Sequence, residues 1–265
     1  MKKLLNSYFR VFFLVVTIIL TVEFVSANSD KPWMEQLDFD ESFDSLDVTE
    51  WGENGSLWLA HTPWNGDFGQ AKFTYSALNN PFSVSRGILQ ITASNSGQQT
   101  WKSGLLALNS NASDYRSYET GYFEARMKFP RGHGLWPAFW LIGEDRTGFT
   151  AEIDIVEHYG RQPNKYSTNV HVWKKHKGGV NNSLHKKKSV DDGLLQDEFN
   201  LYGVDIEPHE LVFYFNRKEY WRIKKPKEFY GMKFYPLVNL AMTEYNHRLN
   251  NDEYHMQVDY VRVYK

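Results

Sequence analysis

Hydrophobic and polar residues alternate along most of this chain, in short segments separated by turn residues. Between 122 and 129, every second residue is apolar, namely Phe123, Ala125, Met127 and Phe129. This period of two is that of a strand with one buried face. Further strands are expected at 88–93, 150–158, 166–173, 199–206, 210–216, 218–223, 234–242 and 255–264. Because no long stretch repeats at helical spacing, the pattern predicts an all-β fold, either a sandwich or a barrel.

The succession of these segments indicates one domain. No linker, internal repeat or low-complexity tract interrupts residues 39–265, and a chain of 265 residues can bury a large β core. Residues 28–38 are mostly polar, and we expect them to form a loose N-terminal tail. Two packed sheets leave an outer face free, and a curved outer face forms a groove that suits a polymer.

The first 27 residues have the pattern of a secretory signal peptide. Two early lysines are followed by an apolar run from 11 to 22 and by Val25-Ser26-Ala27, which supplies the small residues of a cleavage site. The apolar run is short for a transmembrane span of about 20 residues, although an uncleaved anchor is the alternative. We therefore expect a secreted or periplasmic chain beginning near Asn28, with no membrane association after cleavage. The absence of cysteine excludes disulfides.

Three carboxyl groups lie within six residues in Glu152-Ile153-Asp154-Ile155-Val156-Glu157, a segment with strand-forming spacers. Alternation places Glu152 and Asp154 on one face and the isoleucines in the core. Glu157 would then point inward, where an unpaired carboxylate is costly. A β-bulge at Val156 would return Glu157 to the acidic face, and bulges are common beside active sites.

The spacing of these acids is compatible with catalysis by a pair of carboxyl groups. Side chains of Glu152 and Glu157 that lean together could bring their carboxyls to roughly 5–6 Å, the separation found in glycosidases that retain anomeric configuration. Asp154 between them could share a proton with its neighbours and keep their pKa values apart. The alternative is an acidic strand at an exposed sheet edge, which the apolar spacers disfavour.

These acids belong to a larger motif. They follow the segment Gly134-Leu135-Trp136-Pro137-Ala138-Phe139-Trp140-Leu141, and the chain closes with Val258-Asp259-Tyr260-Val261-Arg262-Val263-Tyr264. Together these segments resemble the signature of glycoside hydrolase family 16, in its bulged, laminarinase-like branch. The resemblance makes residues 39–265 the catalytic domain and implies a β-jelly-roll sandwich of two curved antiparallel sheets with a concave substrate cleft. It also implies that Glu152 is the nucleophile, Asp154 the assisting acid and Glu157 the general acid/base, with no cofactor for catalysis.

Aromatic and polar side chains near the acids are candidates for sugar binding, because indole faces pack on the C–H faces of sugar rings. Trp136 and Trp140 share one face of their segment, and we expect His171 on the next strand to hydrogen-bond the acid/base Glu157. The alternative for the two tryptophans and for His171 is a structural role in the core. The candidate substrate-binding residues are Trp64, Trp101, Trp136, Trp140, Asn169, His171, Trp173 and Glu244.

The net charge and the distribution of charged residues bear on the kind of partner that the chain can bind. With 30 Lys and Arg against 32 Asp and Glu, the net charge of −2 argues against a nucleic-acid partner. The stretches 174–177 and 185–188, each with three lysines and one histidine, favour a solvated loop. The alternative is a basic rim that attracts an acidic polysaccharide. No sequence signature of a catalytic metal is present. The family resemblance implies a structural calcium, with Asp259 as the matching residue.

The sequence thus predicts an enzyme that acts on polysaccharide, expected to be a monomer. The leading hypothesis is an endo-acting, retaining hydrolase of β-1,3- or mixed β-1,3/1,4-linked glucan. One alternative is a depolymerase of an acidic, succinoglycan-like bacterial exopolysaccharide, because the segment 61–69 also resembles depolymerases of this kind. The other is a transglycosylase with the same chemistry. A carbohydrate-binding protein would need the aromatic residues but not three aligned acids.

Overall fold

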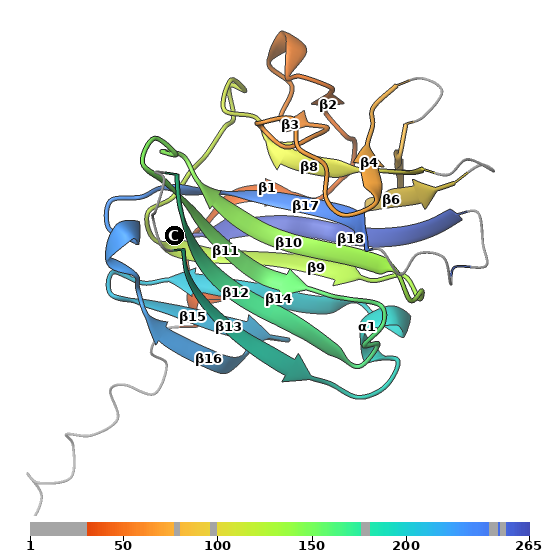
Figure 1. Ribbon diagram of the computed structural model, residues 1–265. Coiled ribbons are helices and arrows are strands. Elements are labelled where there is room, and N and C mark those ends of the chain that lie inside the picture. The colour runs from red at the N-terminus through yellow and green to blue at the C-terminus, as the bar shows by residue number, and fades with distance from the viewer. Residues whose placement is uncertain (1–30, 77–79, 96–99, 176–180, 244–248, 250–252) are drawn as a thin grey trace, which may run out of the picture.

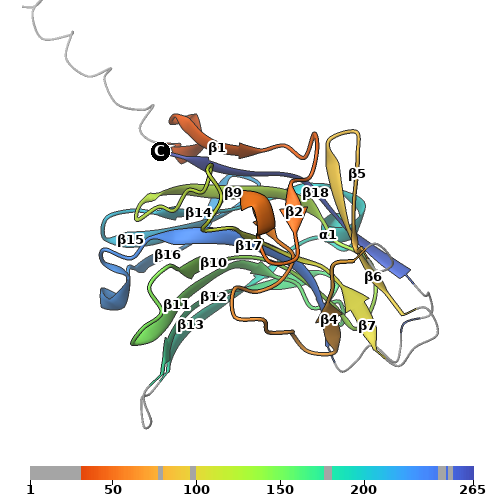
Figure 2. The same cartoon turned by 90° about the horizontal axis from the view of Figure 1, so that it is seen from above.

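A computed structural model describes residues 31–76, 80–95, 100–175, 181–243, 249 and 253–265. In this part of the chain two sheets pack face to face (Figures 1 and 2). The first sheet has the order β16-β15-β14-β9-β18-β6-β7-β4, with β1 also paired to β18 and β5 to β6. The second has the order β13-β12-β11-β10-β17-β8-β3-β2. Pairing is antiparallel except for the short pairs β2–β3 and β4–β7, which are parallel.

The strands of the first sheet are β1 (Leu37–Glu41), β4 (Ala71–Phe73), β5 (Phe82–Ser85), β6 (Ile88–Ser94), β7 (Trp101–Ser103), β9 (Gly121–Lys128), β14 (Asn200–Ile206), β15 (Glu210–Phe215), β16 (Lys218–Lys224) and β18 (Glu253–Tyr264). Those of the second are β2 (Val48–Thr49), β3 (Trp58–Leu59), β8 (Leu105–Leu108), β10 (Leu135–Gly143), β11 (Phe149–Glu157), β12 (Lys165–Lys174), β13 (Asn182–Ser189) and β17 (Phe234–Met242). The described helices are short: η1 (Pro32–Met34), η2 (Glu53–Gly55), η3 (Lys227–Phe229) and α1 (Leu194–Asp197). None of them is long and apolar enough to cross a membrane.

The hydrophobic core lies between the two sheets, as the alternating pattern predicts. The apolar face of β9 is buried through Phe123, Ala125 and Met127, and β11 contributes Ile153 and Ile155 from the opposite sheet. Figure 2 shows that strands β10 to β13 curve, so that the sheet has a concave outer face. The acidic residues of β11 lie on this outer face, and the rest of the fold supports it from behind.

Residues 31–38 do not form the loose tail expected from their polarity. The helix η1 and strand β1 pack on the first sheet, where the Trp33 ring lies 5.5 Å from that of Tyr122 and 5.4 Å from that of Tyr214. This segment covers a face of β9 that alternation alone predicts to be solvated. Glu124 is consequently fully buried. The pairing of β1 with β18 and the contacts of Trp33 hold this segment on the sheet despite the polarity of its residues.

Buried Glu124 is neutralised by a clamp of three side chains. Arg217 donates to both of its carboxylate oxygens, at 3.0 and 2.8 Å, while the hydroxyls of Tyr122 and Tyr260 donate at 2.8 Å each. Arg217 has a left-handed backbone (φ 58°) in the β15–β16 turn, and its guanidinium lies over the Trp33 ring. The clamp therefore joins the N-terminal segment, β9, β18 and the hairpin.

Replacing Arg217 with Met is expected to lower the free energy of unfolding by about 2–3 kcal/mol, because a buried carboxylate loses its charged partner and keeps only the two hydroxyls. Urea unfolding followed by circular dichroism measures the change. Arg131→Met is the matched control, since it removes an exposed pair with Asp197 and should leave the midpoint where it is. Equal midpoints for the two variants would contradict the importance of the clamp.

Candidate active site

A cavity of about 410 Å³ lies on the concave face, a size typical of sites for small ligands and sugar units. Its floor comes from β10, β11, β12 and β17, and a loop after β3 contributes one wall. The side chains that line it are Trp64, Phe68, Trp136, Ala138, Trp140, Glu152, Asp154, Glu157, Tyr159, Asn169, His171, Trp173 and Asn239. All three predicted carboxylates are among them.

The predicted β-bulge is present in β11. Asp154 pairs with Asn169 of β12 and Glu157 pairs with Ser167, so that Ile155 and Val156 together lie opposite the single residue Thr168. Against β10, the skipped residue is Ile155 rather than Val156, because Phe139 pairs with Val156 and Trp140 with Asp154. The Thr168 hydroxyl donates to the carbonyl of Ile155 at 2.9 Å and holds the irregular backbone. The bulge keeps both apolar residues in the core and returns Glu157 to the cleft.

Glu157 is held by three donors. Trp136 Nε1 donates to Oε1 at 2.9 Å, the Tyr159 hydroxyl donates to the same oxygen at 3.2 Å, and Asn169 Nδ2 donates to Oε2. Burial raises the pKa of Glu157, and these hydrogen bonds oppose the rise because they favour the ionised form. The carboxyl group is therefore fixed in position while its proton affinity stays above that of an exposed glutamate.

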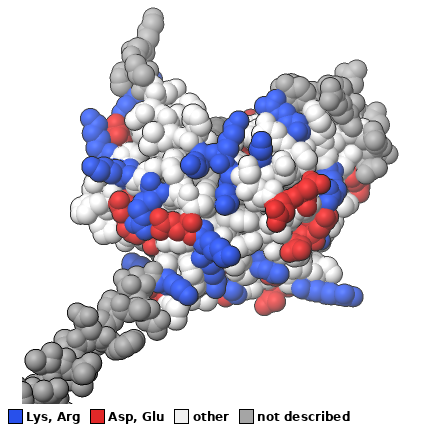
Figure 3. Space-filling view, turned by 90° about the horizontal axis from the view of Figure 1, so that it is seen from below, with Lys and Arg blue, Asp and Glu red and all other residues white. Residues whose placement is uncertain are grey.

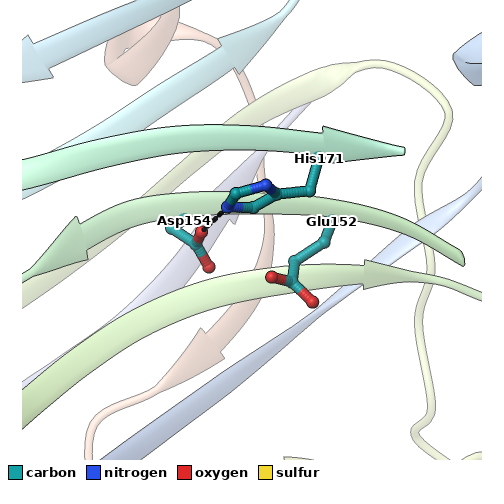
Figure 4. Close-up of side chains that lie close together, drawn as sticks. All are labelled: Glu152, Asp154 and His171. Carbon is teal, nitrogen blue, oxygen red and sulfur yellow. Dashed lines mark ion pairs between the residues drawn. The ribbon is translucent and has the colours of Figure 1, made fainter. Parts of the chain in front are cut away.

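Glu152 and Asp154 form a second group with His171 (Figure 4). Ligand atoms of the three residues all lie within 4.8 Å of one another, and His171 Nε2 is 3.2 Å from Asp154 Oδ2. The other ring nitrogen of His171 bonds the Ser183 hydroxyl at 2.6 Å. The expected partner of His171 was Glu157, and this expectation is corrected: His171 contacts Asp154, and Asn169 contacts Glu157. The reason is register, since His171 lies opposite Glu152 and Asn169 lies opposite Asp154.

Burial and neighbouring negative charge raise the pKa values of Glu152 and Asp154. Burial, followed by the negative charge of Asp154, raises the pKa of Glu152 from an ordinary 4.5 to about 8, against the opposing effect of His171. Burial and the charge of Glu157 raise the pKa of Asp154 well above its ordinary value. All three carboxyl groups thus have raised pKa values, and acid and base chemistry at one pH requires groups whose pKa values are shifted by their surroundings.

Aromatic rings surround the acids on several sides. Trp140 is buried, and its Nε1 donates to Asn239 Oδ1 at 2.8 Å. Trp64 is 42% exposed and meets the Trp140 ring edge-on at 6.2 Å, while the 37% exposed Trp173 stacks on His171 at 4.5 Å. Exposed indole faces beside a polar floor are suited to sugar rings.

The sequence profile of glycosyl hydrolases family 16 matches residues 69–262, and this range contains the acidic strand, its bulge and the strand with Asn169, His171 and Trp173. The chain belongs to this family. Among its relatives, endo-1,3-1,4-beta-glycanase EglC of Rhizobium meliloti is 34% identical over 198 residues, which are 71% of this chain and 40% of EglC. Glucan endo-1,3-beta-glucosidase A1 of Niallia circulans is 27% identical over 255 residues, covering 83% of this chain and 36% of that protein. The chain thus spans about two fifths of the length of these relatives.

The family-16 fold is shared with solved structures. The catalytic domain of an endo-1,3-beta-glucanase (laminarinase) from Thermotoga petrophila superposes with a TM-score of 0.69 at 20% identity, over 87% of this chain and 98% of that chain. The jelly-roll sandwich predicted from the sequence is thereby confirmed. It differs from the prediction only in its two short parallel strand pairs.

One predicted sugar-binding residue, Trp101, does not line the cavity. Trp101 is 4% exposed and packs on Tyr254 in the core, so its expected role in a sugar subsite is corrected. Trp101 is the first residue of β7, and its ring lies on the inward face of that strand. The turn-rich sequence before Trp101 had suggested an exposed loop. Glu244 lies outside the described residues.

The cavity residues that were not among the candidates from the sequence include Phe68 and Tyr159. Tyr159 follows Glu157 by two positions, and the alternation that placed Asp154 would have placed Tyr159 as well. Its ring stacks on Trp136 at 5.2 Å. Phe68 lies in a loop without periodicity, and its contacts with Trp136 and Trp140 are long-range. Only the fold brings Phe68 to the site.

The surroundings of Asp259 do not fit the calcium that the resemblance implied. Asp259 Oδ2 lies 2.5 Å from Arg126 Nη1, and a guanidinium at this distance repels a cation. Calcium takes six to eight oxygen ligands. Among the described residues, the group of acidic and histidine side chains close enough together to hold an ion is Glu152, Asp154 and His171, and Asp259 is not part of it.

The lysine-rich segment is partly a strand. Residues 182–189 form β13, an exposed edge strand paired with β12, where a solvated loop was expected. Lys187 lies opposite Ser167, which itself lies opposite Glu157, so Lys187 faces the cleft side of the sheet. Figure 3 views the molecule from below and shows Lys and Arg side chains gathered beside a hollow in its upper edge. Residues 176–180 lie outside the described part of the chain.

Proposed function

We propose that this chain is an endo-acting glycoside hydrolase that cleaves β-1,3- or mixed β-1,3/1,4-linked glucan with retention of configuration. The observation that carries the proposal is the placement of Glu152, Asp154 and Glu157 along one cleft floor, among exposed tryptophans. The name of EglC specifies an endo-1,3-1,4-beta-glycanase and that of the Niallia enzyme an endo-1,3-beta-glucosidase, and both support the substrate class. A groove on the outside of a sheet suits an internal segment of a polymer.

In the proposed reaction, Glu152 attacks the anomeric carbon while Glu157 protonates the departing glycosidic oxygen. The sugar is then bound covalently to Glu152. Glu157, now ionised, takes a proton from the incoming water, which displaces Glu152 and restores both groups. Asp154 lies between these groups, and its negative charge raises the pKa of Glu152. His171 orients Asp154 from the adjoining strand.

The direct test uses purified protein with laminarin and with mixed-linkage β-glucan. Reducing ends and the size distribution of products distinguish internal cleavage from release of end sugars. Proton NMR of the first products reads the anomeric configuration, for which the proposal expects the β form before mutarotation. Initial α products, or release of single sugars from chain ends, would contradict it. Longer products from defined oligosaccharides would instead indicate transglycosylation.

Export is a further part of the proposal, because a glucan polymer is met outside the cell. Residues 1–27 would direct secretion, and the N-terminus of exported protein should be Asn28. Mass spectrometry of protein from the medium or periplasm identifies that end. Full-length protein retained in the cell membrane would favour the uncleaved anchor.

The pH dependence of activity tests the coupling of the carboxyls. Glu152 must be ionised to attack, and its pKa is raised to about 8 by burial and then by Asp154. The acidic limb of kcat/KM is therefore expected far above pH 4.5, with activity increasing through neutrality. Asp154→Asn removes one negative charge, lowers the pKa of Glu152, and should shift this limb toward lower pH while reducing the maximum. Profiles from pH 4 to 10 measure both shifts, and a limb that stays in place would contradict the coupling.

A further inference from the structure

A second cavity, of about 380 Å³, adjoins the first at Glu152. Trp64, Glu152 and Trp173 line both cavities and form their common boundary. The remaining lining of the second cavity is Ile142, Arg146, Thr150 and Lys175. These residues come from the end of β10, the turn that follows it, and the adjoining ends of β11 and β12. The cleft thus continues past Glu152 into a space with a different chemical character.

Two cations line this second cavity without a carboxylate partner. Neither Arg146 nor Lys175 takes part in an ion pair within the described part of the chain, whereas neighbouring Lys174 is paired with Glu228 at 2.9 Å. The guanidinium of Arg146 lies over the Trp64 ring, 5.0 Å from its centroid, which fixes its position. The backbone N–H of Lys175 donates to the Gly148 carbonyl at 3.3 Å.

The acids near these cations are otherwise engaged. Asp145 is exposed, and one of its oxygens accepts from both the backbone N–H and the hydroxyl of Thr147, at 2.9 and 2.8 Å. These hydrogen bonds lower the pKa of Asp145 more than the charge of Lys175 does, and the two side chains do not form an ion pair. Glu144 accepts from the Tyr115 hydroxyl at 2.7 Å. Glu152 lies at the boundary with the first cavity, where its proposed role is in the reaction. Positive charge in the second cavity is therefore available to a ligand.

We propose that the second cavity binds a carboxylate carried by the glycan, so that Arg146 and Lys175 select for an acidic substituent or a uronic acid next to the cleaved sugar. This inference rests on the proposed function, since it assumes that a glycan occupies the first cavity. The planar fork of an arginine matches a carboxylate in two parallel hydrogen bonds, and a lysine adds a point charge. Trp64 and Trp173 would hold the sugar ring that carries the group. A neutral glucan would leave both cations without a counter-charge, which lowers its relative affinity.

The test compares unmodified mixed-linkage glucan with the same glucan lightly carboxymethylated, as ratios of kcat/KM. In the unaltered protein the ratio should favour the charged polymer and decline as salt is added. In Arg146→Gln, which keeps most of the side-chain length over Trp64, the ratio is expected to fall by about tenfold. The double variant with Lys175→Gln should lower it further. Lys187→Gln is the matched control, because it removes a lysine from the cleft side of β13 without touching the second cavity.

Each outcome is informative. An unchanged ratio in Arg146→Gln, or an equal loss in Lys187→Gln, would overturn the proposal in favour of general attraction by the basic surface. A preference for sulfated over carboxymethylated glucan would overturn the choice of carboxylate. If the protein cleaves none of these polymers, the proposed function fails, and calorimetry of Glu157→Gln with carboxymethylated oligosaccharide still tests the cavity. Binding there that is lost on Arg146→Gln would support the anion site by itself.

Discussion

Glu152→Gln is expected to reduce kcat on β-glucan on the order of 10⁴-fold or more, because the amide cannot form the covalent bond to the anomeric carbon. The substitution preserves the size of the side chain and removes a buried carboxyl whose pKa is already raised by its surroundings. The melting temperature should therefore be equal to or above that of the unaltered protein. Stopped assays of reducing ends, at enzyme concentrations high enough to detect the residual rate, measure the loss.

A chemical control separates the nucleophile from a merely important residue. In a Glu152→Gly variant, azide can enter the vacated space and attack the anomeric carbon from the same side. Restored turnover on an activated glycoside, with an α-glycosyl azide as product, is the expected result. A β-glycosyl azide from this variant, or a Glu152→Gln protein with normal turnover, would show that another group is the nucleophile.

Glu157→Ala is expected to show a loss that depends on the leaving group. On glucan, whose departing sugar hydroxyl needs a proton, the loss should be about 10²–10⁴-fold, as for removal of a general acid. On an aryl glycoside with an acidic phenol, formation of the covalent intermediate should be nearly unaffected, and the intermediate should accumulate. A burst of phenol in rapid-mixing experiments measures this accumulation.

The variant also tests the donors around Glu157. Trp136, Tyr159 and Asn169 lose their common acceptor in Glu157→Ala, so a modest fall in melting temperature is expected. Azide should restore turnover and yield a β-glycosyl azide, the opposite anomer to that from the nucleophile variant. Equal losses on glucan and aryl glycoside would assign Glu157 a structural role in place of proton transfer.

The sequence was most informative where a strand has one buried and one functional face. The strand expected at 150–158 is β11, and alternation together with the cost of a buried carboxylate was sufficient to predict the bulge before Glu157. The strand at 234–242 is β17, with the bounds that its apolar run indicated. In these segments local preference, burial and function all favour the same conformation.

Predictions from the sequence were less accurate for segments whose conformation depends on pairing with neighbouring strands. β13 is exposed on nearly all its residues, so no buried face marks it as a strand, and only pairing with β12 makes it one. His171 was placed on the correct face, but alternation does not give the stagger between strands that brings it to Asp154. Trp33 and Trp101 were misjudged for the same reason, since a single aromatic residue is buried or exposed according to segments distant in sequence.

The lysine-rich composition of β13 affects whether other extended chains can pair with this edge of the sheet. An edge strand presents unpaired backbone N–H and C=O groups, which another extended chain can match. Consecutive Lys186, Lys187 and Lys188 place positive charge on both faces of this edge, and a second copy approaching in register would meet the same charges. A strand added there would extend the second sheet beyond β13. The lysines therefore disfavour pairing of this edge with a second copy of the chain.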